Sequence, residues 1–238
     1  MWQVIDTGIS SAEKNMALDA EFLKNLSDSQ NPILHFYEWE KDSATFGHFI
    51  QPEAFLNVDK AKELGLSLAK RPTGGGIVFH LWDMAFSVLV PSSSSHFSLN
   101  TLENYAFVND IVLKAVKTFL EEAGGLLMIQ EDMPSLDPSC VRFCMAKPTK
   151  YDVVLEGKKI AGAAQRQTKA GFLHQGTIAL MLPDTAYLED VLLPSTRVLE
   201  AMQTHTYPLL GKTASRKELE RAKLRLKQLL VTFFKDLE

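Results

Sequence analysis

The sequence predicts an α+β protein in which helices flank a mixed, mostly antiparallel β-sheet. Strand-type and helix-type segments follow one another without the regular alternation of a parallel α/β fold, and no segment repeats at a fixed period. A chain of 238 residues, 46% of them apolar, can bury a sizeable core. We therefore expect one domain over 1–238, mainly helical from about residue 186, with no separate accessory domain.

The first half of the chain is predicted to mix strands and helices. Strands are expected at 2–8, 33–39, 44–50, 66–71, 76–80 and 84–91. Ser10 and Glu13 have the spacing of a capping box, so a helix is expected to follow them. The predicted apolar positions of that helix are Met16, Ala17, Ala20, Leu23 and Leu26. Further helices are predicted at 58–65 and 100–123, and each is stopped by glycine.

The second half is predicted to contain a β-hairpin, one more strand and several helices. The segment at 151–167 turns at its Glu-Gly pair, and a strand is expected at 172–182. Helices are predicted at 185–192, at 195–203 and from about residue 215 onward. In the last of these, Ser215 and Glu218 repeat the capping-box spacing. The apolar residues that we expect to dock this helix on the sheet are Leu219, Ala222, Leu226, Leu229, Leu230 and Phe233.

Composition and charge argue against several classes of function. The net charge of -4 and the absence of a long basic run give no support for general binding to nucleic acid or to a membrane surface. No apolar stretch reaches the roughly 20 residues of a membrane span, and the N-terminus lacks the layout of a secretory signal. With only two cysteines, Cys140 and Cys144, we expect a reducing cytoplasmic location. No metal-ligand spacing occurs, so no protein metal site is expected.

Three consecutive glycines in "KRPTGGGIVFH", at 70–80, lie between two predicted strands and follow Arg71. A glycine run in this position can be a simple bulge or tight bend. Alternatively, the missing side chains let a phosphate or an extended acyl chain approach the backbone N–H groups directly. The pattern is neither a phosphate-binding loop ending in Gly-Lys-Ser/Thr nor a dinucleotide-binding fingerprint.

A lysine pair precedes small residues in "GKKIAGAAQRQ" on the predicted hairpin. In a regular strand Lys158 and Lys159 point to opposite faces, so one can reach the sheet while the other is solvated. A lysine held there acts as a point charge toward a phosphate or a developing oxyanion. The simpler interpretation is two solvated lysines near a hairpin tip.

A cysteine stands shortly before the hairpin, in "VRFCMAKPTKYDVV". Cys144 is either a small buried hydrophobic residue or a nucleophile. Lys147 and Lys150 would favour its thiolate form if they faced it.

Four segments in this order resemble the lipoate-protein ligase A and octanoyltransferase family, whose fold is related to that of biotin-protein ligase catalytic domains. They are "NMALDAEFL", "RPTGGGIVFH", "KPTKYDVVLEGKKIAGAAQRQ" and "LHQGTIAL", and they span most of the chain. The resemblance implies that the glycine turn and the small-residue strand cradle an acyl chain, and that Lys159 contacts the reacting carbonyl or phosphate. The substrate-binding residues it implies are Arg71, Gly74, Gly75, Gly76, His80, Gly162, Ala163, His174, Gly176 and Thr177.

The resemblance implies attachment of a lipoyl or octanoyl group to a lysine of a carrier domain. The carrier would be the lipoyl domain of a 2-oxoacid dehydrogenase E2 subunit or the glycine cleavage H protein. Our first expectation is a ligase that forms acyl-AMP from lipoate and ATP with Mg²⁺, with Lys159 as the catalytic lysine. The triple glycine resembles the ligase turn.

Three alternatives remain at this point. Cys144 precedes "PTKYD" in the register of a transferase nucleophile, so it could take octanoate from acyl carrier protein as a thioester, without ATP. A non-catalytic protein that binds lipoyl or biotinyl groups is the second alternative. A biotin ligase is the third, and the hairpin sequence disfavours it.

Overall fold

The computed structural model describes residues 1–121, 124–211 and 213–237. Ten strands lie at Gln3–Ser10 (β1), Ile33–Trp39 (β2), Ser43–Phe46 (β3), Ser67–Lys70 (β4), Ile77–His80 (β5), Asp83–Pro91 (β6), Leu126–Met128 (β7), Val153–Leu155 (β8), Lys158–Thr168 (β9) and Gly171–Ala179 (β10) within these ranges. The α-helices lie at Ala12–Asn25 (α1), Val58–Glu63 (α2), Thr101–Phe119 (α3), Thr185–Val191 (α4), Val198–His205 (α5) and Arg216–Lys235 (α6). Short 3₁₀ helices lie at Pro52–Ala54 and Cys140–Arg142.

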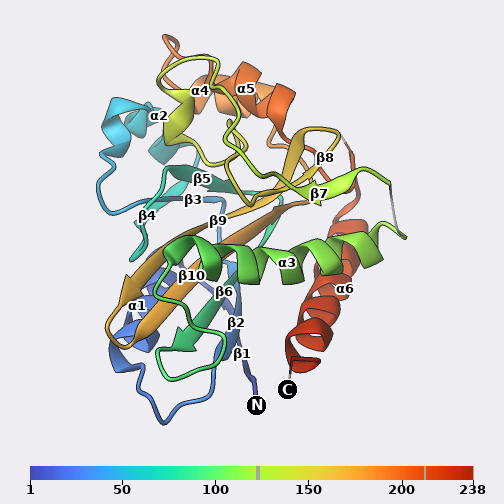
Figure 1. Cartoon of the computed structure of the whole chain (residues 1–238). Helices are drawn as coiled ribbons and strands as arrows, with labels where there is room; N and C mark the ends of the chain where they lie inside the picture. The colour runs from blue at the N-terminus through green and yellow to red at the C-terminus, as the bar shows by residue number, and fades with distance from the viewer. Residues whose placement is uncertain (122–123, 212, 238) are drawn as a thin grey trace.

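The strands form two sheets (Figure 1). The larger has seven strands in the order β1-β2-β6-β10-β9-β8-β7, and its pairs are antiparallel except for the parallel pair β1 and β2. The smaller has the order β4-β3-β5, with one parallel and one antiparallel pair. The predicted α+β class with a mixed, mostly antiparallel sheet is therefore confirmed.

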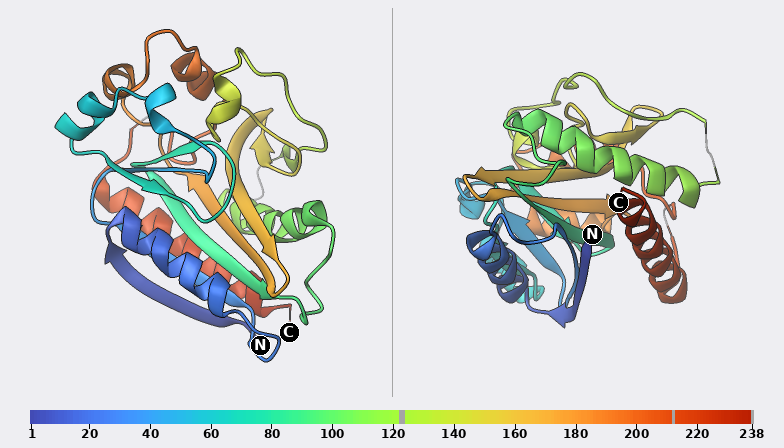
Figure 2. Two further views of the ribbon diagram at one scale, coloured as in Figure 1. Left: turned by 90° about the vertical axis from the view of Figure 1, so that its left-hand side faces the viewer. Right: turned by 60° about the horizontal axis from the view of Figure 1, so that its bottom comes forward.

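Helices cover both faces of the large sheet. In two further views, α1 lies on one side of it, while α3 and α6 lie on the other (Figure 2). The main core forms under α3 and α6, where Phe86 and Phe172 of the sheet pack against Val112 and Leu226. The buried face of α6 matches the prediction except at its end, since Phe234 is fully buried and Phe233 only partly so. Phe234 follows Leu230 by four residues and so continues the same helical face.

The first helix differs from its prediction at its start and on its buried face. Ser10 ends β1, and Ser11 is the N-cap, whose side chain accepts a hydrogen bond from the Lys14 N–H. The predicted capping box of Ser10 and Glu13 therefore does not form, and the helix begins one residue later. Ala17 and Ala20 are exposed, and the buried face consists of Ala12, Asn15, Met16, Asp19 and Leu23. Two polar residues thus lie on the face that the sequence pattern was expected to fill with alanines.

Several predicted boundaries move. The strand expected at 44–50 ends at Phe46, because the chain then turns so that Gly47 lies against the backbone of Gly75. The helix expected at 100–123 ends at Phe119, while 122–123 fall outside the described residues. The three-residue strand β7 was not predicted.

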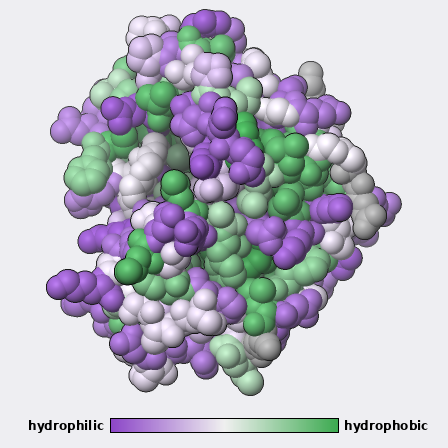
Figure 3. Space-filling view, in the orientation of Figure 1, coloured by the Kyte–Doolittle hydropathy of each residue, from purple (hydrophilic) through white to green (hydrophobic). Residues whose placement is uncertain are grey.

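The exposed surface is mixed in character. A band of hydrophobic residues crosses the middle of the face in Figure 3, with hydrophilic residues around it. No helix in the described ranges is long and apolar enough to cross a membrane.

Candidate active site

A narrow cavity lies between α1, the small sheet and strands β9 and β10. It collects most of the predicted site residues from segments far apart in the sequence. Its lining consists of Met16, Tyr37, Trp39, Thr45, Arg71, Val78, His80, Cys144, Gly162, Ala163, Ala164, Gln175, Gly176 and Thr177.

The three glycines of the turn have three different environments. Gly75 has φ +82°, a left-handed conformation that glycine adopts without strain. A Cβ on Gly76 would overlap the backbone carbonyl of Arg142, whereas a Cβ on Gly74 would meet no atom within 4 Å. A Cβ on Gly47 would overlap the Gly75 carbonyl. The turn is therefore packed tightly against its neighbours at Gly76 and is open at Gly74.

Alanine substitution should distinguish the tightly packed glycine of the turn from the open one. We expect Gly76→Ala to lower the free energy of unfolding by about 3 kcal/mol or more, because backbone must move to admit the methyl group. Gly74→Ala should change it by less than about 0.5 kcal/mol. Urea unfolding of the two variants checks this, and equal losses would contradict the described turn.

Arg71 is buried and holds the turn together. Its guanidinium donates to the carbonyl oxygens of Thr45 (2.9 Å), Gly74 (3.1 Å) and Gly76 (2.7 Å). Burial lowers the pKa of Arg71, and the neighbouring Cys144 side chain acts in the opposite direction. Arg71 thus shapes the site through the backbone while bringing a positive charge to Cys144.

Cys144 lines the cavity beside the turn. Its N–H donates to the Ile77 carbonyl at 3.0 Å, which fixes the residue against β5. A Cβ built on Gly75 would lie 3.9 Å from the Cys144 Sγ and 3.3 Å from an Arg71 nitrogen. The two lysines near it in sequence have other partners, since Lys147 pairs with Asp132 and Lys150 lies over the Tyr151 ring. The cation beside this cysteine is Arg71.

The two lysines of the hairpin separate as predicted. Lys158 is exposed, whereas Lys159 is 2% exposed and forms an ion pair with Asp152 at 2.7 Å. A Cβ on Gly162 would overlap the end of the Lys159 side chain. The small residue at 162, which lines the cavity, therefore leaves room for the end of the lysine beside it.

Tyr105 of α3 holds this ion pair at the edge of the sheet. Strand β8 pairs with β9 only as far as Ala161, so the next backbone groups need other partners. The Tyr105 hydroxyl donates to the Ala163 carbonyl or to Asp152 Oδ1 and accepts from the Ala163 N–H at 2.9 Å. Burial raises the pKa of Tyr105 well above its usual value, so the hydroxyl stays protonated.

A hydrogen-bonded cluster around His80 forms another part of the cavity wall. His80 bonds Asp83 at 2.6 Å and Thr45 at 2.8 Å, and the Trp39 ring stacks on it at a centroid distance of 4.2 Å. The Thr177 hydroxyl donates to the same Asp83 oxygen. Although burial alone would raise it, the pKa of Asp83 is lowered, because His80 and Thr177 stabilise the carboxylate.

A buried polar network under the cavity was missed by the sequence analysis. Asp19 accepts hydrogen bonds from Ser87 (2.5 Å) and Gln175 (2.6 Å) and contacts His35. Gln175 in turn accepts from Thr73 at 2.7 Å, which ties the glycine turn to α1. An aspartate within the apolar stripe of a predicted helix was the signal that could have revealed it.

His174 does not reach the cavity. It points to the α3 side of β10, where its ring lies 5.2 Å from that of Tyr105. Gly176, on the same strand, borders the cavity with its backbone, and a Cβ there would overlap Phe86. His174 is therefore left out of the site. The predicted residues that line the cavity are Arg71, His80, Cys144, Gly162, Ala163, Gly176 and Thr177.

His174 should make the protein sensitive to acid. Burial lowers its pKa from 6.5 to about 3. Below pH 6.5 His174 binds a proton in the unfolded chain but stays neutral in the folded one. The free energy of unfolding therefore decreases as the pH falls from about 6.5 toward 3. At pH 4.5 the loss in the free energy of unfolding amounts to roughly 2–3 kcal/mol.

Urea unfolding at pH 7 and pH 4.5 tests this, with wild type and His174→Gln compared. Between pH 7 and pH 4.5, His174→Gln should lose roughly 2–3 kcal/mol less stability than wild type does. His48→Gln, at an exposed position, should behave as wild type. An unchanged pH dependence in His174→Gln would contradict the assignment.

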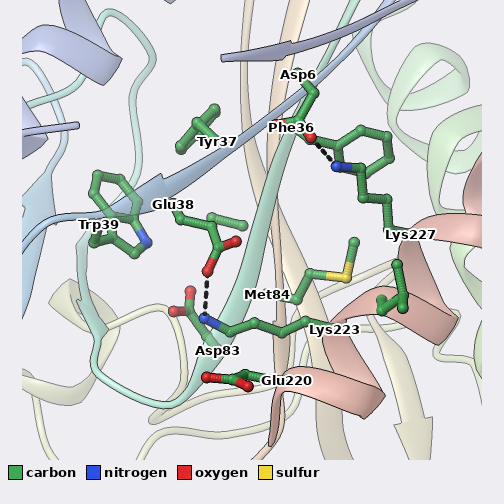
Figure 4. A pocket seen from close by; sticks show the side chains of 12 residues that line it. Asp6, Phe36, Tyr37, Glu38, Trp39, Asp83, Met84, Glu220, Lys223 and Lys227 are labelled. Carbon is green, nitrogen blue, oxygen red and sulfur yellow. Dashed lines mark hydrogen bonds and ion pairs between the residues drawn. The ribbon is translucent and has the colours of Figure 1, made fainter. Parts of the chain in front are cut away.

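A larger cavity of about 160 Å³ lies between β2, β6 and α6 (Figure 4). Its two lysines form ion pairs, Lys223 with Glu38 and Lys227 with Asp6. Tyr37 and Trp39 line both cavities, but none of the predicted site residues lines this one.

Comparison with known proteins identifies the family. The family model of the lipoyl protein ligase A/B catalytic domain matches residues 11–237. The chain belongs to this family. The Bacillus subtilis octanoyltransferase LipM is 30% identical over 204 residues, covering 85% of this chain and 73% of that protein.

Two solved structures share the fold. A lipoate-protein ligase A bound with ATP has a TM-score of 0.67 at 23% identity, covering 98% of this chain and 86% of its own. A bipartite lipoate protein ligase of Thermoplasma acidophilum, studied with its E2 lipoyl domain, has a TM-score of 0.68 at 22% identity, covering 98% and 84%. These likenesses confirm the predicted lipoate-ligase-like fold.

The comparisons confirm an enzyme of the type that attaches lipoyl or octanoyl groups, and both expected routes are compatible with them. The chain spans 65–66% of the length of three further LipM octanoyltransferases, from two Staphylococcus species and from Lysinibacillus sphaericus.

Proposed function

We propose that this protein is an octanoyltransferase that carries the acyl group on Cys144. The observation that supports this most directly is the position of the thiol, which lines the narrow cavity beside Arg71 and the glycine turn. A thiolate there would have a buried guanidinium as its neighbour, and cationic surroundings of this kind make cysteines reactive. The LipM relatives are named octanoyltransferases, which supports the same choice.

The reaction divides into two transfers on the same sulfur atom. In the first, the Cys144 sulfur attacks the carbonyl of an octanoyl thioester on acyl carrier protein. The bond to the carrier sulfur breaks, and the carrier leaves as a thiol with the proton that Cys144 gave up. In the second, a lysine amine of the lipoyl domain attacks the acyl-enzyme carbonyl. An amide forms, and the Cys144 sulfur recovers a proton from the amine.

Lys159 would supply the charge that stabilises both transition states. The ion pair with Asp152 and the room left by Gly162 hold its ammonium group beside Gly162, which lines the cavity. Each transfer passes through a tetrahedral oxyanion, and a fixed cation in a buried site stabilises such a charge strongly. We propose that the acyl chain lies against the small residues of β9 and the backbone of Gly176.

The ligase route is the second candidate, and the open Gly74 position favours it because a phosphate could approach the backbone there. An ATP-bound ligase shares the fold. No group of three or more metal-ligating side chains occurs in the described ranges, so Mg²⁺ would have to arrive with the nucleotide phosphates.

The partners follow from the chemistry. We propose acyl carrier protein as donor and a lipoyl domain, of an E2 subunit or of the H protein, as acceptor. Residues 1–238 would act as one catalytic domain, which the extent of the family match supports. The free cysteines Cys140 and Cys144 suit a reducing cytoplasm.

Donor preference tests the proposal. A purified lipoyl domain is incubated with the protein and either octanoyl-acyl carrier protein or lipoate with Mg-ATP, and its intact mass is measured. We expect an octanoyl mass shift that does not need ATP. Modification that occurs only with the free acid and ATP would establish the ligase route instead, and no modification with either donor would favour a non-catalytic binder.

A further inference from the structure

A basic groove lies beside the glycine turn, outside the cavity that holds Cys144. It is an open hollow of about 430 Å³. Its walls carry three cations, Lys24 of α1 together with Arg166 and Lys169 of the β9–β10 hairpin, and also Pro72 and small or apolar residues. No carboxylate lines it.

The charge of the groove contrasts with that of the whole chain. All three cationic side chains are exposed, and none forms an ion pair with a carboxylate in the described ranges. The chain as a whole carries a net charge of -4. A local positive potential on an acidic protein selects an anionic partner and steers its approach.

The groove is directly connected to the active-site turn. Arg166 donates a hydrogen bond to the Pro72 carbonyl at 3.2 Å. Pro72 precedes Gly75 by three residues, so their Cα atoms are at most about 11 Å apart. Gly75 in turn lies beside Cys144. An anion held in the groove therefore lies next to the loop that leads to the thiol.

We propose that this groove docks the acyl-donor carrier protein through its acidic face and the phosphate of its acyl-bearing arm. The inference rests on the proposed transferase function. The donor suits the site because the phosphate and the reacting thioester belong to the same arm, so binding of the phosphate in the groove helps to position the thioester. The acceptor does not, because its reactive lysine is itself a cation and three neighbouring cations repel it.

Charge reversal of the two lysines tests the groove. In Lys24→Glu/Lys169→Glu, kcat/KM for octanoyl-acyl carrier protein should fall at least about tenfold at low ionic strength, and added salt should narrow the difference. Lys24→Gln/Lys169→Gln should show a smaller loss. Lys217→Glu/Arg221→Glu, an exposed double reversal on α6, is the matched control and should behave as wild type.

Two further readouts locate the effect. With a small neutral octanoyl thioester as donor, kcat/KM should stay within about twofold of wild type, and so should the KM for the lipoyl domain. An unchanged kcat/KM for the carrier-protein donor would overturn the proposal. A raised KM for the lipoyl domain instead would overturn it in favour of acceptor docking, and an equal loss with the small donor would show damage to the active site.

Direct binding separates this proposal from the transferase assignment. Wild-type turnover with octanoyl-acyl carrier protein reports on the assignment. If wild type does not turn over, titration of the protein with that carrier, without acceptor, still decides the groove. Weaker binding by the Lys→Glu double variant would support it, and equal or absent binding would overturn it.

Discussion

Replacing Cys144 by alanine is expected to lower the rate of octanoyl transfer to a lipoyl domain by three orders of magnitude or more. The variant keeps the cavity but has no sulfur to carry the acyl group, and removing a covalent nucleophile generally has effects of this size. Steady-state transfer from octanoyl-acyl carrier protein, followed by intact mass of the lipoyl domain, measures the loss.

Cys140 provides the matched control. It is completely buried, belongs to the hydrophobic cluster around Phe143, and does not line the cavity. Cys140→Ala should cost some stability but keep at least about half the transfer rate at a temperature where it is folded. Equal losses in the two alanine variants would point to packing and contradict a nucleophile at Cys144.

Replacing Lys159 by methionine should have the second large effect, on stability and on activity together. The change leaves the Asp152 carboxylate buried without its cation, and breaking a buried ion pair in this way costs about 3–5 kcal/mol. The transfer rate should fall as well, because the oxyanion loses one of the fixed positive charges that stabilise it. Urea unfolding and transfer assays measure the two losses.

A double variant separates the two roles of this lysine. In Lys159→Met/Asp152→Asn the unpaired charge is gone, while the new amide can still accept a hydrogen bond from the Thr149 N–H. Most of the lost stability should return, and the transfer rate should stay low. Recovery of the rate along with the stability would show that Lys159 acts only by supporting the fold.

Sequence patterns predicted the fold class and most elements because they depend on local periodicity. The hairpin at 151–167 and the C-terminal helix were located by turn chemistry and capping. Boundaries failed where a tertiary contact ended an element, as at Phe46, after which Gly47 packs against the glycine turn.

The candidate site was predictable only in part. Arg71, Cys144 and the glycines stood out by residue type, whereas Tyr105 and Asp152 became visible only when α3 met the edge of β9. Strand alternation predicted that Lys158 and Lys159 point to opposite faces, and the resemblance singled out Lys159, but neither predicted its partner Asp152. His174 was expected to bind substrate but does not line the cavity, because the resemblance gives a residue and not its orientation.

The acyl-enzyme itself is the most direct test of the account. The protein is mixed with octanoyl-acyl carrier protein without acceptor, quenched in acid, and examined by intact mass and peptide mapping. We predict an octanoyl adduct on the peptide that contains Cys144, which disappears on addition of lipoyl domain at least as fast as steady-state turnover. The absence of any adduct on wild type while transfer proceeds, or an adduct that is not consumed by the lipoyl domain, would contradict a Cys144 thioester.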